Sequence, residues 1–265
     1  MDLIDAHLAF LRSSGYAADT LDDRRRVLRT LDNALLFGIA DVTPDELTTW
    51  MDRPDWSTQT KATYRGHIVG FYRWAAALQH LCCDPSTGLV RPKVPQGLPH
   101  PATEDELRQA LAELPEPWRL YCLIAAYTGA RAGEVSRLNR HEVTPERVLL
   151  HGKGGKDRYV PTDPYIWAAV EPLPAGAIAV SKTGLRRSPG HVSTVFGRMM
   201  RRIGLAHLTL HSFRHRFATV LLAACGNLRV VQELLGHASP TTTAIYTLVT
   251  DAQRRDAIAK LPRLA

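Results

Sequence analysis

Apolar residues recur every three or four positions through most of the first third of the chain, with charged residues between them. This spacing places the apolar side chains on one face of a helix. It predicts four helices, which run from Met1 to Arg12, from about Thr20 to Leu36, onward from Thr43, and from about Ser57 to His80. The third helix has a strong start, because Thr43-Pro44-Asp45-Glu46 supplies a capping box with proline at the first helical position. We therefore expect residues 1–88 to form a domain built only of helices.

The fourth predicted helix has an apolar stripe and a basic side. The stripe consists of Tyr64, Ile68, Phe71, Ala75 and Leu78. Three basic residues lie away from the stripe, namely Lys61, Arg65 and Arg73. A basic helix face is most often only solvated, so the sequence by itself leaves DNA contact and plain solvent exposure equally open.

A proline-rich stretch separates this helical region from the rest of the chain. Four prolines lie between Val90 and Pro101, where they exclude a helix and favour a stiff, extended connector. We place the domain boundary here, with residues 89–101 as the linker and residues 102–265 as the second domain.

The second domain combines helices with one hairpin. Its predicted helices run from the capping box at Thr103 to about Leu114, from about Pro117 to Tyr127, from Arg131 over a short segment, and from Ser188 to Arg202. Glu134 either orients Arg131 or simply caps the short helix. Residues 147–151 and 158–161 are predicted strands, joined by a glycine-rich turn that carries Lys153 and Lys156. The predicted fold class is mainly α with a small β-sheet (α+β).

Composition narrows the class of partner. Lysine and arginine number 33 against 26 acidic residues, which gives a formal charge of +7 and a pI near 9.4. Such a balance favours a polyanionic partner, either nucleic acid or an anionic membrane. No apolar run reaches the ~18 residues that span a bilayer, and the acidic N-terminus is unlike a signal peptide. The four cysteines lack CxxC spacing and are typical of reduced thiols. We expect a cytoplasmic, nucleoid-associated protein that binds nucleic acid and no membrane.

Candidate catalytic residues lie toward the C-terminus. His211 and Arg214 are three positions apart, so on a helix they share a face and can converge on one small anion. A guanidinium matches phosphate oxygens, an imidazole can transfer a proton, and a nearby hydroxyl such as that of Tyr246 can act as a nucleophile. Each of these residues alone is more often an ordinary packing or surface residue. His211 and His215 have a zinc-like spacing, but the neighbouring glutamate and a third ligand are missing, so we expect no metal.

Five short motifs occur in a fixed order along the second domain. The upstream pair is Thr128-Gly129-Ala130-Arg131-Ala132-Gly133-Glu134 and His151-Gly152-Lys153-Gly154-Gly155-Lys156-Asp157-Arg158. The other three are His211-Ser212-Phe213-Arg214-His215, Leu234-Leu235-Gly236-His237 and Tyr246. In this order and spacing they resemble the tyrosine recombinases, the family of phage integrases and Xer-type enzymes. The resemblance covers nearly the whole chain and is most specific over residues 128–247.

This resemblance implies both a fold and a reaction. In the family, an N-terminal helical (SAM-like) core-binding domain and a C-terminal catalytic domain close a C-shaped clamp around DNA. Tyr246 would attack the scissile phosphate and form a 3′-phosphotyrosine. Arg131 and Arg214 would hold the non-bridging oxygens in the transition state.

The remaining implied catalytic residues handle protons and hydrogen bonds. Lys153 would protonate the departing 5′-oxygen, and His211 would be the acid–base partner of the tyrosine. His237 would donate a hydrogen bond to a non-bridging oxygen. Because the covalent link conserves the bond energy, we expect neither a metal nor any other cofactor.

The resemblance also strengthens the case for DNA contacts by basic residues. The candidates are Lys61, Arg65, Arg73, Lys156, Arg198, Arg201 and Arg202. The expected partner is a pair of double-stranded DNA core sites that a homo-tetramer brings together through the segment after Tyr246. The plain alternative for that segment is folding back onto its own domain. An accessory or directionality factor is left open.

The helical region begins almost at Met1, so we expect no additional N-terminal arm-binding domain. This favours a simple site-specific recombinase, an integrase of a phage or mobile element, with Xer-type resolution of chromosome or plasmid dimers still open. A type IB topoisomerase and a catalytically idle DNA-binding regulator are further alternatives. The Gly-Lys-Gly hairpin and the Leu-Leu-Gly-His motif favour a recombinase over a topoisomerase, and the presence of all six catalytic residues opposes an idle regulator.

Overall fold

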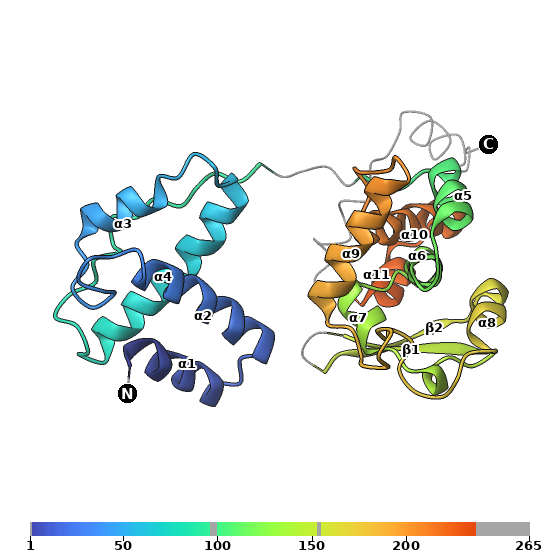
Figure 1. The fold of residues 1–265 in the computed structure, drawn as a ribbon, viewed down its shortest axis with the longest axis horizontal. Coiled ribbons are helices and arrows are strands. Elements are labelled where there is room, and N and C mark those ends of the chain that lie inside the picture. Colours follow the sequence, from blue (N-terminus) through green and yellow to red (C-terminus); the bar gives the residue numbers. More distant parts are fainter. Residues whose placement is uncertain (1, 96–99, 153–154, 237–265) are drawn as a thin grey trace, which may run out of the picture. The chain divides into compact units, whose positions relative to one another are not determined.

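The computed structural model describes residues 2–95, 100–152 and 155–236, and the polypeptide divides into two compact units, residues 1–97 and 98–265 (Figure 1). The division falls inside the proline-rich stretch, and each unit has its own hydrophobic core. Among the helices that the structure describes, none is both long and apolar enough to cross a membrane.

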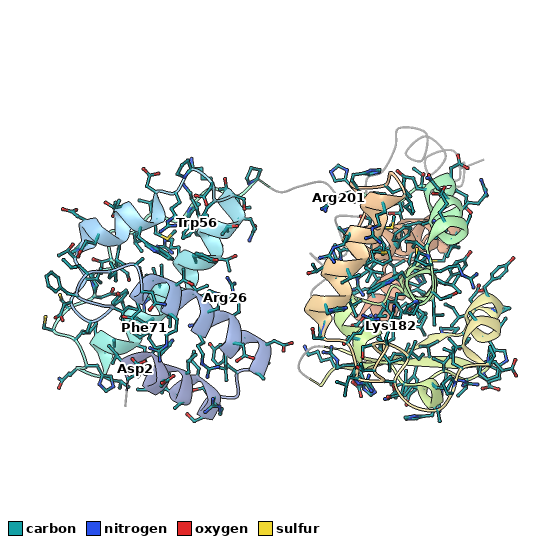
Figure 2. All side chains as sticks on the ribbon, in the orientation of Figure 1. Asp2, Arg26, Trp56, Phe71, Lys182 and Arg201 are labelled. Carbon is teal, nitrogen blue, oxygen red and sulfur yellow. The ribbon has the colours of Figure 1, made fainter. Side chains whose placement is uncertain are left out.

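The described part of the first unit is helical. Its helices are α1 Leu3–Ser13, α2 Ala18–Asp32, α3 Pro44–Met51 and α4 Thr58–Ala77. The four predicted helices are confirmed, with ends that shift by a few residues. The capping box forms as predicted, since Thr43 Oγ1 accepts from Glu46 N at 3.3 Å and Glu46 Oε2 accepts from Thr43 N at 2.8 Å. Phe71 of α4 is fully buried in the core that α4 shares with α1 and α2 (Figure 2).

One residue of the predicted apolar stripe lies outside this core. Leu78 is 53% exposed, because α4 ends at Ala77 and the chain leaves the helical path at Gln79, where φ is 58°. A left-handed backbone at a non-glycine residue breaks the helical period. The prediction that the stripe continues to Leu78 is therefore wrong.

The described part of the second unit surrounds one hairpin with helices and a short 3₁₀ turn, η1 Arg140–Glu142. Strands β1 Arg147–His151 and β2 Asp157–Pro161 pair antiparallel, with His151 opposite Asp157. The helices are α5 Glu104–Glu113, α6 Trp118–Thr128, α7 Ala132–Arg137, α8 Pro164–Val170, α9 Pro189–Arg202, α10 Leu210–Cys225 and α11 Leu228–Leu235. The predicted fold class, mainly α with a small β-sheet, is confirmed.

Helix α6 crosses the core of this unit and fixes the loop that leads to Arg131. The helix packs against α5 and α10, and it ends at Gly129, where φ is 65°. A Cβ at Gly129 would lie 2.7 Å from Phe217 Cδ1 and 2.9 Å from Leu235 Cδ2. Only glycine fits there, because it tolerates positive φ and lets α10 and α11 approach the end of α6. The loop after α6 is thereby held against both of these helices.

Candidate active site

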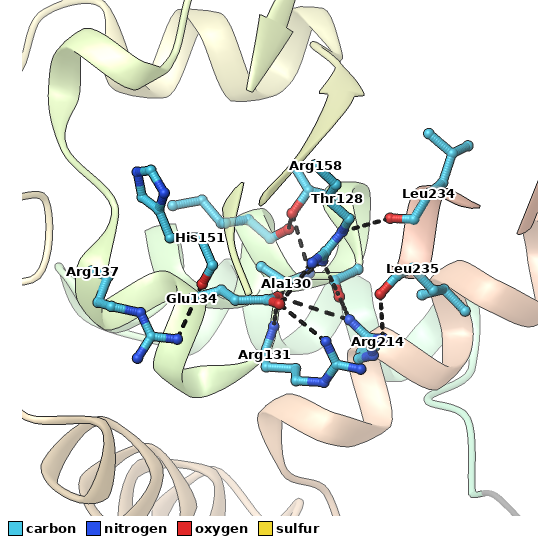
Figure 3. Close-up of polar contacts among 12 residues, drawn as sticks. Thr128, Ala130, Arg131, Glu134, Arg137, His151, Arg158, Arg214, Leu234 and Leu235 are labelled. Atoms are coloured by element: carbon cyan, nitrogen blue, oxygen red, sulfur yellow. Dashed lines mark hydrogen bonds and ion pairs between the residues drawn. The ribbon is translucent and has the colours of Figure 1, made fainter. Parts of the chain in front are cut away.

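The carboxylate of Glu134 is the centre of the candidate site (Figure 3). Its side chain is 1% exposed, and it lies in the first turn of α7. Glu134 Oε2 accepts from Arg131 N at 2.7 Å, and Oε1 accepts from Arg131 Nη1 at 3.0 Å. Both roles considered for Glu134 are therefore present, since it caps α7 and also orients the guanidinium of Arg131.

A second arginine, Arg158 of β2, grips the same carboxylate. Arg158 Nη1 donates to Glu134 Oε1 at 2.6 Å, and Nη2 donates to Oε2 at 2.9 Å. Its Nε donates to the carbonyl of Leu234 at 2.7 Å. From the sequence, Arg158 is visible only as part of a motif, without a role of its own. The alternation of the strand carries a signal for it, because Arg158 shares the buried face of β2 with Val160, and a charged residue on a buried face needs a partner.

The third arginine at this carboxylate is Arg214 of α10, whose side chain is 1% exposed. Its Nη1 donates to the carbonyl of Gly129 and lies 3.8 Å from Glu134 Oε2. Its Nη2 donates to the carbonyl of Leu235 at 2.7 Å. The structure thus brings Arg131 and Arg214, which are far apart in sequence, to one carboxylate. We call Glu134, Arg131, Arg158 and Arg214 the Glu134 cluster.

Electrostatics keep this cluster positive. Burial by itself raises the pKa of Glu134, but hydrogen bonds and charge from Arg158, with help from Arg131 and Arg214, lower it below its ordinary value overall. The carboxylate is therefore ionised at neutral pH, and it faces three guanidinium groups. Because the Arg131 side chain is 40% exposed, the excess positive charge is open to an anion from solvent on that side.

His211 lies on the same helix as Arg214, at the start of α10. Its ring packs edge-on against that of His215, with 4.2 Å between the centroids. Desolvation, followed by the charges of Arg214 and Arg131, lowers the pKa of His211 below its ordinary value. A neutral imidazole near two arginines can accept a proton at neutral pH. Within the described residues, no group of three or more His, Cys, Asp or Glu side chains is placed to hold a metal ion.

His151 stabilises the strand ends next to the turn that carries Lys153. Its Nε2 lies 2.6 Å from Glu142 Oε1, and its Nδ1 lies 3.0 Å from Asp157 Oδ2 on the opposite strand. The hydrogen bond to Glu142 raises the pKa of His151 above its ordinary value. Arg137 Nη2 also donates to the His151 carbonyl at 3.0 Å and so links α7 to this strand (Figure 3).

Three of the predicted catalytic residues, Lys153, His237 and Tyr246, lie outside the described residues. Their place relative to the Glu134 cluster is a prediction from the sequence. The described backbone does reach the segments next to two of them, because β1 and β2 flank the turn with Lys153, and Gly236 directly precedes His237.

The candidate DNA-binding residues fall into two groups. Arg73, Lys156, Arg198, Arg201 and Arg202 are exposed. Lys61 and Arg65 are partly buried and have partners within the first unit. Arg65 Nε donates to the Leu89 carbonyl at 2.7 Å, and Lys61 Nζ lies 3.8 Å from Asp52 Oδ1. Arg65 therefore fastens the start of the proline-rich stretch to α4, a structural role that the sequence analysis did not consider.

Comparison with known proteins places the second unit in one family. The model of the phage integrase family matches residues 102–253. Tyrosine recombinase XerC 2 of Ralstonia nicotianae is 30% identical over 282 residues, which cover 93% of this chain and 81% of that protein. Tyrosine recombinase XerA of Pyrococcus horikoshii is 34% identical over 185 residues, and the chain spans 65% of its length.

A solved structure shows the same fold. The lambda integrase dimer bound to a COC′ core site matches 99% of this chain and 79% of its own, with a TM-score of 0.73 and 20% identity. The similarity therefore extends through both units, while the sequence match and the family model cover the segment that holds the Glu134 cluster. The chain belongs to the phage integrase family, the tyrosine recombinases, which cut and rejoin DNA strands.

Proposed function

We propose that this chain recombines DNA at specific sites through a covalent 3′-phosphotyrosine intermediate, with Tyr246 as the nucleophile. The observation that carries the proposal is the meeting of Arg131 and Arg214 at Glu134, where Arg131 Nη1 lies 3.0 Å and Arg214 Nη1 lies 3.8 Å from the carboxylate oxygens. Guanidinium groups so arranged match the non-bridging oxygens of a phosphate.

In the proposed cleavage step, the phenol oxygen of Tyr246 bonds to phosphorus and the bond to the 5′-oxygen breaks. Negative charge grows on the non-bridging oxygens as the phosphorus becomes pentacoordinate. Arg131 and Arg214 would stabilise that charge without reorganisation, because Glu134 and backbone carbonyls already hold them. Removal of one such preorganised donor typically costs on the order of 10²-fold in rate.

Two proton transfers accompany this step. Since its pKa lies below the ordinary value, His211 is mostly neutral at pH 7 and would take the phenol proton. Lys153 would give a proton to the departing 5′-oxygen, and His237 would donate to a non-bridging oxygen. Lys153, His237 and Tyr246 enter the proposal through their sequence motifs. Attack by a 5′-hydroxyl of the partner duplex then releases the tyrosine and joins the strands.

The proposed assembly follows from the exchange reaction. Two duplexes, each cut on both strands, require four nucleophiles, so the active form would be a homo-tetramer on paired core sites. Residues 1–88, which lie within the first unit, would serve as the core-binding domain that completes a clamp around each half-site. DNA phosphates would be held by the exposed candidate residues Arg73, Lys156, Arg198, Arg201 and Arg202. The segment after Tyr246 would dock on a neighbouring protomer.

Two biological roles fit this chemistry. Integration of a phage or mobile element is our main proposal, and Xer-type resolution of dimers is the alternative. Relatives named as Xer recombinases support the alternative, and two of them align with more than nine-tenths of the chain. Two substrates distinguish these roles. One is a single plasmid with two direct copies of the DNA site, which reports resolution, and the other is a pair of plasmids with one copy each, which reports joining. Efficient resolution with little joining between plasmids would select the Xer-type role.

The experiment that tests the proposed function uses a nicked suicide duplex. A DNA site is first selected from random-sequence duplexes by binding to the wild-type protein, and a nick near the cleavage position then traps the cut strand. We expect a covalent protein–DNA adduct that maps to Tyr246 and disappears in Tyr246→Phe. The matched control is Tyr165→Phe, which alters an exposed tyrosine on α8 and should leave the adduct unchanged. An adduct that persists in Tyr246→Phe contradicts the proposal.

A further inference from the structure

Arg158 takes no direct part in the proposed reaction, yet its guanidinium is bonded on several sides within the Glu134 cluster. It is 8% exposed, and it donates to both oxygens of Glu134 and to the carbonyl of Leu234. Its Nη2 also lies 3.5 Å from the Gly129 carbonyl, to which Arg214 donates as well. A guanidinium has five N–H donors in a fixed plane, and here they reach three separate segments.

Those three segments each lead to a residue of the proposed reaction. Glu134 holds Arg131, and Gly129 shares its carbonyl with Arg214. Leu234 lies near the end of α11 (Figure 3). In sequence it stands two residues before Gly236, which directly precedes His237. Arg158 itself lies on β2, the strand that leaves the turn with Lys153. One side chain therefore joins the hairpin, both arginines and the end of α11.

The shape of the backbone allows this close approach. Gly236 has a φ of 62°, and a Cβ built on it would lie 3.0 Å from Arg158 Cδ and 3.3 Å from Nη1. A side chain at this position would press on Arg158, so the glycine leaves room for the guanidinium under the end of α11. The carbonyls at a helix C-terminus carry partial negative charge, which suits the two guanidinium groups that bond to Leu234 and Leu235.

The charges also call for a third arginine. Without Arg158, the carboxylate of Glu134 would have only Arg131 and Arg214 as partners, and it would attract both of them more strongly. Arg158 takes two of the hydrogen bonds of the carboxylate, so that Arg131 makes one side-chain hydrogen bond to it and Arg214 stays 3.8 Å away. It also helps to keep Glu134 ionised, because its hydrogen bonds and charge lower the pKa of that group.

We infer that Arg158 is a positioning residue for strand cleavage, which holds Glu134 so that Arg131 and Arg214 face the scissile phosphate. The inference rests on the proposed function and assigns a role to a residue that does not itself touch DNA. Arg158 acts through the charge that the two arginines offer to the transition state. Its removal should therefore slow cleavage of a charged phosphodiester much more than cleavage of an uncharged analogue.

The test compares two versions of the nicked suicide duplex built on the selected DNA site. One carries an ordinary scissile phosphodiester, and the other carries a methylphosphonate, in which a methyl group replaces one non-bridging oxygen and removes the negative charge. Single-turnover rates of adduct formation are measured for wild type, Arg158→Gln and Arg158→Lys. Saturating protein is used, and the bound fraction in a gel-shift assay counts the folded molecules.

We expect Arg158→Gln to slow cleavage of the phosphodiester by roughly tenfold to a hundredfold, by analogy with the loss when the hydrogen-bond partner behind a metal ligand is removed. The loss on the methylphosphonate should be several times smaller. Arg158→Lys keeps the charge but loses the fork, so it should recover part of the rate and show the same dependence on substrate. It also keeps the test open if Arg158→Gln does not fold.

The control is Arg147→Gln, which removes an arginine from β1 that lies over the ring of Tyr159, 4.4 Å from its centroid, at the other end of the hairpin. Its rates should equal those of the wild type. Equal losses on the two substrates, or no loss with either Arg158 variant, would overturn the inference while the proposed function stands. Absence of an adduct with wild-type protein would instead contradict the proposed function, and the inference would fall with it.

Discussion

Two sets of arginines, one from each unit, are paired with acidic residues in contrasting surroundings. In the first unit, Arg25, Arg26 and Arg29 pair with aspartates on the surface, and their side chains are 38–57% exposed. In the second unit, Arg158 and Arg214 are buried around Glu134. Exposed ion pairs contribute little to stability, whereas buried charges cost desolvation energy and need complete partners. Because of this desolvation energy, a cluster of three arginines around one buried carboxylate is a poor means of stabilising a fold. Its presence indicates a preorganised anion site.

The largest effect should come from removal of the shared carboxylate. Glu134→Gln leaves Arg158 and Arg214 buried without their counter-charge, and breaking a buried pair in this way costs about 3–5 kcal/mol. Urea unfolding of the second unit measures the loss. The matched change in the first unit is Asp22→Asn, which removes an exposed partner of Arg25 and should leave unfolding unchanged. If both variants changed the free energy of unfolding by similarly small amounts, the buried and the exposed arginine pairs would not differ as described.

The next effect separates catalysis from stability. Arg131→Ala should slow adduct formation on the order of 10²-fold, since a preorganised donor to the transition state is lost. Its stability should change little, because that side chain is partly exposed. Single-turnover cleavage and urea unfolding are measured on the same preparation. Arg119→Ala removes an exposed arginine of α6 that pairs with Glu116, and it serves as the control. A cleavage rate near that of the wild type would show that Arg131 does not serve the reaction.

A pH experiment examines a buried histidine of the first unit, His7. His7 packs against Phe71 and Trp74, and burial, followed by the charge of Arg24, lowers its pKa from 6.5 to about 4. Between these values the unfolded chain binds a proton that the folded protein does not. Stability should therefore fall as the pH drops from about 6.5 to about 4. Hydrogen exchange of peptides from α1 and α4, measured over this pH range, reports the stability of the first unit. In His7→Gln the slope of stability against pH should be smaller.

The wild-type slope, measured in the same peptides of α1 and α4, is the reference for this experiment. If His7→Gln keeps it, acid lability of the first unit arises elsewhere. His215 in the second unit, whose pKa is likewise lowered to about 4, should produce the same dependence in peptides from α10.

The smallest effect concerns DNA affinity. Arg73 is exposed on α4, whereas Arg65 on the same helix bonds to the Leu89 carbonyl. If Arg73 contacts a phosphate, Arg73→Gln should weaken binding to the selected DNA site at every salt concentration and lower the salt slope by about one. Arg65→Gln should leave that slope unchanged. Gel-shift titrations over a range of salt test both, and a reduced slope for Arg65→Gln alone would exchange the two roles.

Local patterns in the sequence were enough to predict most of the helices. The capping boxes at Thr43 and Thr103 and the hairpin around Lys153 follow from nearest-neighbour chemistry, and the structure has the boxes and both strands. Helix α8 was missed, since its seven residues give too short a period. The prediction that Leu78 belongs to the buried stripe was wrong, because the end of a helix depends on the turn that follows it.

In the candidate site, too, local features could be predicted from the sequence and tertiary contacts could not. The pair His211 and Arg214 is visible as a helical spacing, and Arg131 is visible as a motif residue. The grip of Arg158 on Glu134 depends on which strand face is buried and on where α11 ends, so tertiary packing decides it. The same holds for Arg65, whose partner Leu89 lies in a segment that the sequence alone marks only as a connector.

In the proposed reaction, Arg131 and Arg214 hold one scissile phosphate. The most direct measurement is a crystal structure of Tyr246→Phe bound to the selected DNA site, uncut and with an intact phosphodiester. We expect the guanidinium groups of Arg131 and Arg214 both to lie within hydrogen-bond distance of the non-bridging oxygens of the same phosphate, with Arg158 still bonded to Glu134. A complex in which that phosphate touches neither arginine, or in which the two arginines hold different phosphates, would contradict this expectation.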